Sequence, residues 1–104
     1  MKRTAGDAHA EIVRNGVCIG ITGAITIDNV ARLIEIGRAQ LGPEVREVDL
    51  SGLSEVDSSA IGLLLEWQRV AQAQHRVHLR FKNLPENLRS LASLYDVLEL
   101  IPET

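Results

Sequence analysis

Apolar and polar residues follow two different rhythms along this chain, and the changes between them mark the predicted elements. Alternating or short apolar segments predict strands at residues 11–14, 17–22, 45–50 and 77–81. Asn15-Gly16 lies between the first two and supplies the positive φ angles of a tight hairpin turn. A turn is expected at Ser51-Gly52, after the third strand, and residues 97–101 predict one more short strand.

Apolar residues recur at helical spacing in three other segments. Thr26 is the expected N-cap of the first helix, which Gly42-Pro43 ends after about four turns. The second helix opens at residues 57–60, where Asp57 and Ser58 can act as caps, and the third follows residues 83–85. The apolar faces are, in order, Ile27, Val30, Ile34 and Leu41; Ile61, Leu64, Leu65, Gln68 and Ala71; Leu88, Leu91, Ala92 and Tyr95.

Strands and helices alternate after the hairpin, and this order predicts an α/β fold. We expect a mixed sheet of about four to five strands covered by about three helices. Residues 1–10 are small and polar without periodicity, so we expect a flexible N-terminus there and one domain over residues 11–104.

Composition narrows the class of protein. A chain of 104 residues that is 45% hydrophobic and 24% charged has the make-up of one packed domain. Its longest unbroken apolar run, residues 60–65, is far shorter than the roughly 18 residues of a membrane span, and we expect a cytoplasmic protein. A net charge of -3 and only three aromatic residues argue against binding to nucleic acid.

Residues suited to catalysis are sparse. The single cysteine, Cys18, has no partner for a disulfide, and without a Cys pair we expect no metal and no cofactor. The chain lacks a glycine-rich phosphate loop, an HExxH or CxxC motif and a nucleophile elbow. Asp57 beside Ser58 is not a hydrolase pair without a histidine base. We therefore expect that the protein is not an enzyme.

The most informative segment runs from Val48 to Leu65 and reads VDLSGLSEVDSSAIGLLL. A helix N-terminus carries unpaired N–H groups and about half a positive charge, so the Ser58 and Ser59 hydroxyls lie where an anion or a partner's carboxylate is favoured. A phosphate added there would bring about -1.5 to -2 charges beside Asp57 and repel a partner fitted to the hydroxyl. The alternative is that Asp57 and Ser58 only cap the helix, which is worth about 1 kcal/mol.

Trp67 has two possible roles. Leu63, Trp67 and Val70 form an apolar stripe offset from the main apolar face of the second helix. Either both sides of this helix are buried in the domain, or the extra stripe meets a partner, for which a large aromatic side chain is a typical anchor.

The segment from Val48 to Leu65 resembles the signature of the STAS family, the sulfate-transporter and anti-sigma-factor-antagonist domains. The matching parts are a strand ending in Asp-Leu-Ser and the run Asp-Ser-Ser-Ala-Ile-Gly that opens a helix. Within the family the chain is most similar to the small MlaB-type subunit of the Mla phospholipid ABC system, through Gly62-Leu63-Leu64-Leu65 and through the Leu-Ala-Ser-Leu-Tyr run at residues 91–95. Ser58-Ser59 departs from the Thr-Gly of that subunit and matches the phosphoswitch antagonists.

The resemblance implies a non-catalytic accessory subunit that binds the cytoplasmic ATPase of an Mla-like phospholipid ABC transporter, with a permease in the same complex. Docking would use the helix that starts at Ser58, and the protein would lie at the inner membrane only through its partner. The alternative is an anti-sigma factor antagonist that binds an anti-sigma kinase until Ser58 is phosphorylated. The expected partner-binding residues are Asp57, Ser58, Ser59, Ile61, Gly62, Leu63 and Trp67.

Overall fold

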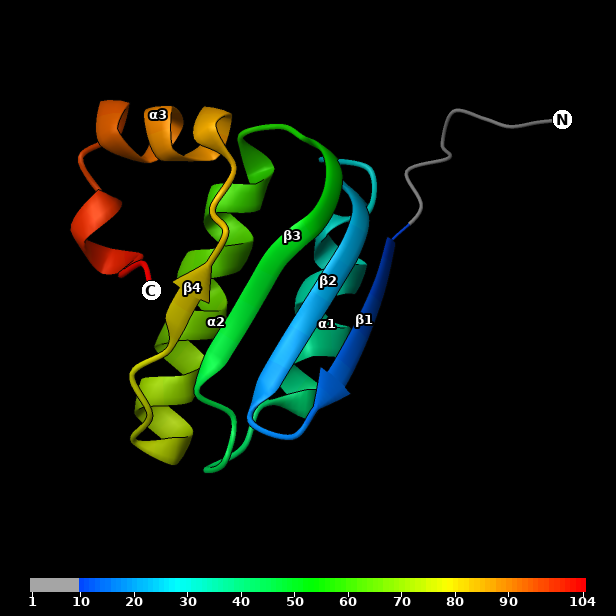
Figure 1. Cartoon of the computed structure of the whole chain (residues 1–104), viewed down its shortest axis with the longest axis vertical. Coiled ribbons are helices and arrows are strands. Elements are labelled where there is room, and N and C mark those ends of the chain that lie inside the picture. The colour runs from blue at the N-terminus through cyan, green and yellow to red at the C-terminus, as the bar shows by residue number, and fades with distance from the viewer. Residues whose placement is uncertain (1–9) are drawn as a thin grey trace, which may run out of the picture.

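The computed structural model describes residues 10–104 and contains one four-stranded sheet with its helices (Figure 1). Its elements are β1 (Ala10–Asn15), β2 (Cys18–Ile25), α1 (Val30–Gln40), β3 (Glu47–Val56), α2 (Ser59–His75), β4 (Arg80–Lys82), α3 (Glu86–Leu94) and the 3-10 helix η2 (Leu98–Leu100). The flexible N-terminus expected for residues 1–10 lies outside the described residues, except for Ala10, which is the first residue of β1.

The sheet is mixed and has the order β1-β2-β3-β4. β1 and β2 form an antiparallel hairpin in which Asn15 still pairs with Cys18, so the two turn residues are Gly16-Val17 and not the expected Asn15-Gly16. Gly16 has a positive φ of 66°, which glycine adopts readily. β2 pairs with β3 and β3 with β4 in parallel. The α/β class and the mixed sheet predicted from the sequence are therefore confirmed, with four strands and three α-helices among the described residues.

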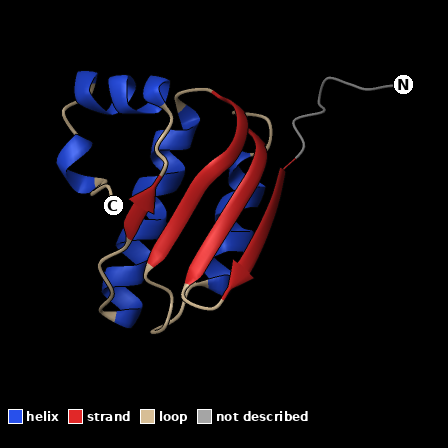
Figure 2. Ribbon diagram, in the orientation of Figure 1, coloured by secondary structure: helices blue, strands red, loops and turns tan. Residues whose placement is uncertain are grey.

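The core lies between the sheet and the two long helices, α1 and α2, which cover the same face (Figure 2). Inward side chains of β2 and β3 are fully buried against both helices, and each such side chain contributes about 1.5–3 kcal/mol of apolar burial. α3 lies across the edge of the sheet where β3 ends, and η2 follows it beside α2 (Figure 1). Buried side chains of the core include Ile19, Ile21, Val48, Leu50, Leu33, Leu64, Phe81 and Leu88.

Trp67 belongs to the core. Its side chain is fully buried, and its indole Nε1 donates a hydrogen bond to the carbonyl oxygen of Ile34 on α1 at 3.2 Å. Gly37 of α1 packs directly against the indole ring, because any side chain there would overlap it. α2 is thus buried on two sides, against the sheet and against α1, which explains why the sequence carries a second apolar stripe.

Several predicted boundaries are wrong. The strand expected at residues 77–81 is confined to Arg80–Lys82, and the one expected at residues 17–22 extends to Ile25. β3 continues through Ser51-Gly52 to Val56, because Gly52 pairs with Thr22 of β2 and keeps these turn-prone residues extended. Residues 97–101 form no strand and instead contain the 3-10 helix η2. Just before them, Asp96 adopts a left-handed conformation with φ of 62°. The N-cap of α1 is Asn29 and not Thr26, so the helix begins at Val30 and Ile27 lies outside it.

The contact between Gly37 and Trp67 predicts a test of the core. Gly37→Ala places a methyl group where the indole ring lies, so we expect the free energy of unfolding to fall by about 2–3 kcal/mol. The matched control is Gly62→Ala on the exposed side of α2, where a Cβ meets nothing within 4 Å; it should raise stability by about 0.5–1 kcal/mol. Urea unfolding of both variants measures the difference, and equal stabilities would contradict this packing.

Candidate functional site

The candidate site lies at the carboxyl ends of β2 and β3, the edge at which open parallel sheets bind their ligands. Two connections meet there: residues 26–29, between β2 and α1, and residues 57–58, between β3 and α2. The backbone N–H of Asp57 donates to the carbonyl oxygen of Ile25 at 3.1 Å, which extends the sheet pairing up to the site.

The Asp57 carboxylate joins these two connections. Its Oδ2 accepts a hydrogen bond from the backbone N–H of Ile27 at 3.0 Å, across 30 positions of sequence. Its Oδ1 accepts from the backbone N–H of Ser59 at 2.9 Å and from the Ser59 hydroxyl. The cap of α2 is therefore supplied by Asp57 rather than by Ser58, and the same carboxylate fixes the neighbouring loop.

These bonds change the acidity of the carboxyl group. Partial burial acts to raise the pKa of Asp57, but the hydrogen bonds from the Ser59 hydroxyl and from the Ile27 and Ser59 amides outweigh it and leave the pKa below its usual value. Asp57 is thus held in its charged, accepting form throughout the physiological range.

The two serines have different environments. The Ser59 hydroxyl is half-buried and donates to Asp57, whereas Ser58 is exposed, and its side chain makes no capping hydrogen bond. No hydrogen bond joins the Ser58 hydroxyl to another described residue. Of the pair, Ser58 is therefore the one whose hydroxyl is free for a partner or for modification.

The loop before α1, which Asp57 holds at the backbone of Ile27, presents an apolar side chain to solvent. Asn29 is buried and donates through Nδ2 to the carbonyl of Ala24 at 2.9 Å, while its Oδ1 accepts from the Thr26 amide at 2.9 Å. These bonds brace the loop, yet the Ile27 side chain remains 73% exposed. Ile27 was predicted to lie on the buried face of a helix. Asn29, a residue type favoured at helix N-caps and found as the N-cap of α1, was the signal that could have placed Ile27 outside the helix.

The expected site residues divide into a surface group and a buried group. Ser58 and Gly62 are exposed, and Asp57 and Ser59 are partly exposed beside them. Ile61, Leu63 and Trp67, in contrast, point into the core, with exposed fractions of 5% or less. These three residues were expected to contact a partner, and their burial corrects that expectation. They are buried because every third or fourth residue of α2 faces the sheet or α1.

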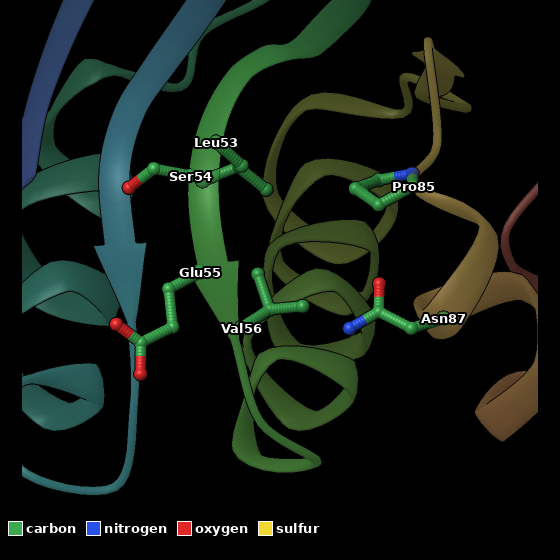
Figure 3. A pocket seen from close by; sticks show the side chains of 6 residues that line it. All are labelled: Leu53, Ser54, Glu55, Val56, Pro85 and Asn87. Carbon is green, nitrogen blue, oxygen red and sulfur yellow. The ribbon is translucent and has the colours of Figure 1, made fainter.

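A small groove opens beside the site, between β3 and the start of α3. In Figure 3, Leu53 and Val56 of β3 point toward Pro85 and Asn87, while Ser54 and Glu55 turn to the other side of the strand. The groove holds about 70 Å³, far less than the roughly 300–1,000 Å³ of small-molecule pockets. We therefore do not assign it a small-molecule or lipid ligand.

Other classes of site are not evident in residues 10–104. This part of the chain brings together no group of three His, Cys, Asp or Glu side chains that could hold a metal ion. It also contains no helix with the length and apolar character needed to cross a membrane.

Comparison with protein-family models identifies one family. A family model described as "Mlab, STAS domain" matches residues 8–102. The solved structure of the anti-sigma factor antagonist SpoIIAA in its unphosphorylated form is similar over 92% of this chain and 88% of that chain, with 15% identity and a TM-score of 0.66, and this likeness shows the fold. No curated protein sequence matches the chain significantly.

Because Asp57 caps α2 and Ser58 does not, substitutions of these two neighbouring residues should change the stability by different amounts. Asp57→Ala removes the cap and the link to Ile27, so we expect the free energy of unfolding to fall by about 1–2 kcal/mol at pH 7. Ser58→Ala removes no described hydrogen bond and should change it by less than about 0.5 kcal/mol.

The pH dependence adds a second measurement. The pKa of Asp57 is lower in the folded state than in the unfolded state, where it is about 4. The ionised carboxylate therefore contributes fully to the free energy of unfolding above about pH 4. This contribution is lost as the pH falls through the pKa of the folded state. The difference between wild type and Asp57→Ala in urea unfolding should therefore narrow below about pH 4. A cost for Ser58→Ala equal to that for Asp57→Ala would contradict the assignment of the cap.

Proposed function

The chain belongs to the STAS domain family, and from this premise we propose that it is a non-catalytic accessory subunit that binds the ATPase of an Mla-like phospholipid ABC transporter. The docking surface consists of Ile27, Ser58 and Gly62, with Asp57 and Ser59 behind it. The description "Mlab" of the matching family model supports this choice of partner. On this proposal the protein lies on the cytoplasmic side of the inner membrane through its ATPase.

One observation carries the proposal: the Ser58 hydroxyl is exposed and unused on a rigidly braced surface. Asp57 and Asn29 fix the loops on both sides of it, so docking costs little conformational entropy. The exposed Ile27 supplies an apolar contact, and Gly62, with nothing within 4 Å of its Cβ position, lets a partner approach the helix closely.

Among residues 10–104, both histidines lie far from Ser58. Of the two described histidines, His75 ends α2, about 25 Å along the helix from its first turn, and His78 follows in the next connection. His78 Nδ1 lies 2.9 Å from the side-chain amide of Gln72, in the last turns of the same helix. Neither histidine can take a proton from Ser58.

A second candidate function rests on the same hydroxyl. An exposed, free serine at a helix start is accessible to a kinase, and a phosphate there would place like charge beside Asp57. The protein would then be an antagonist that binds an anti-sigma kinase until Ser58 is phosphorylated; SpoIIAA, which shares the fold, is itself an anti-sigma factor antagonist. Both candidates share the docking surface and differ in the partner.

A negative charge at Ser58 should abolish binding without unfolding the domain. We expect tagged wild-type protein to recover an ABC ATPase and a permease from native membranes, and Ser58→Asp to recover neither. The thermal midpoints of the two proteins should agree, because the Ser58 side chain makes no capping bond and helix starts tolerate an acidic residue. The matched control, Ser90→Asp on the exposed side of α3, should retain the partners.

The intact mass of the recovered bait separates the two candidates. An unmodified bait with an ABC ATPase supports the transporter subunit. A soluble kinase together with a phosphorylated fraction of bait supports the antagonist instead. Equal recovery of partners by wild type and Ser58→Asp would exclude docking through this surface in either form.

A further inference from the structure

A second exposed apolar surface lies where α3 ends. Leu94 and Tyr95, at the end of α3, and Leu100, in η2, are exposed by 75%, 52% and 50% respectively. In Figure 1 this segment lies on the side of α2 opposite to β1. We call these three residues the C-terminal apolar patch. Apolar side chains that gather on a surface are candidate sites for binding a partner.

A groove continues from this patch onto α2. It is formed by Leu65, Gln68, Arg69 and Gln72 on one side and Leu100 on the other, and it holds about 260 Å³ open to solvent. The distance from Leu65 to Gln72 corresponds to about two helical turns, or about 10 Å. The groove therefore has the length to receive apolar side chains from successive turns of a partner helix.

The unpaired charges around the patch have one sign. Residues 94–104 contain Asp96, Glu99 and Glu103 and no lysine or arginine. Glu103 is neutralised by Arg89 at 2.7 Å, and Arg69 in the groove is neutralised by Glu66 at 2.6 Å. Asp96 and Glu99 are exposed, and neither forms an ion pair with another described residue. The uncompensated charge beside the patch is thus acidic.

From these features we propose that the C-terminal apolar patch and its groove bind a basic amphipathic helix of a partner protein. Its apolar face would cover Leu94 and Leu100 and enter the groove at Leu65, as helices commonly do in recognition grooves. Its lysine or arginine side chains would lie against Asp96 and Glu99. An anionic lipid surface is the less suitable occupant, since the two carboxylates would repel it.

The groove adjoins the proposed docking site on one face of α2, because Leu65 lies one helical turn after Gly62. It contains none of Ile27, Ser58 or Gly62. A subunit with two such surfaces could hold one partner at the start of α2 and a second segment at the end of α3.

The probe is a stapled amphipathic helix of about 14 residues with leucines on one face and lysines on the other, since an unstapled helix of that length is only marginally stable. Its counterpart has glutamates in place of the lysines. Titration followed by amide NMR of the full chain should show binding of the lysine helix, with shifts confined to residues 65–72 and 91–101. The glutamate helix should bind at least about tenfold more weakly.

Two double variants test the two parts of the surface. Leu94→Ser with Leu100→Ser should weaken binding at least about tenfold, and Asp96→Asn with Glu99→Gln about fivefold, with a smaller dependence on salt. The matched control is Val13→Ser with Glu11→Gln on β1, which also removes an exposed apolar side chain and an acid and should bind like wild type.

Three outcomes would overturn the proposal. They are equal affinity for the two helices, shifts spread over all acidic regions of the protein, and sedimentation with phosphatidylcholine or phosphatidylcholine–phosphatidylglycerol vesicles in place of helix binding. Ser58→Asp should bind the lysine helix as tightly as wild type. If the lysine helix does not bind, the proposed function at Ser58 still stands. If Ser58→Asp does not change the recovery of partners, the proposal for the C-terminal apolar patch still stands.

Discussion

The carboxylate of Asp57 is the interaction on which the functional end of this molecule depends. It accepts hydrogen bonds from the loop before α1, at Ile27, and from the first turn of α2, at Ser59. One side chain thus joins two connections that are 30 positions apart in sequence and fixes the orientation of α2 relative to β2. Because Asp57 supplies the cap, the side chain of the neighbouring Ser58 makes no capping hydrogen bond and can contact a partner.

This arrangement separates stability from recognition within a few residues. Below the surface, Leu63 and Trp67 anchor α2 between the sheet and α1, and Gly37 allows the close approach of the two helices. At the surface, Ser58 and Gly62 contribute little to the core. A change of charge at Ser58 can therefore alter binding while the domain stays folded, which is what a regulatory subunit or a phosphorylation switch requires.

Much of this could be predicted from sequence, because local patterns determine the order of elements and the start of α2. The Trp67 stripe shows the limit: a helix buried on two sides and a helix with a partner-facing stripe have the same pattern. Gly52 was predicted to lie in a turn because its pairing with Thr22 is not local. The hydrogen bond from Ile27 to Asp57 likewise joins distant residues, so the role of Asp57 in bracing the loop emerges only from the fold.

Docking of a partner at the carboxyl ends of β2 and β3, where the loop of Ile27 and the start of α2 meet, can be observed by amide hydrogen exchange. The exchange rates are compared between the free protein and its complex with the recovered ATPase. We expect slower exchange in residues 26–29 and 57–62 of the complex and no change along β1. Protection confined to other regions, with residues 57–62 exchanging as in the free protein, would show that the partner docks elsewhere.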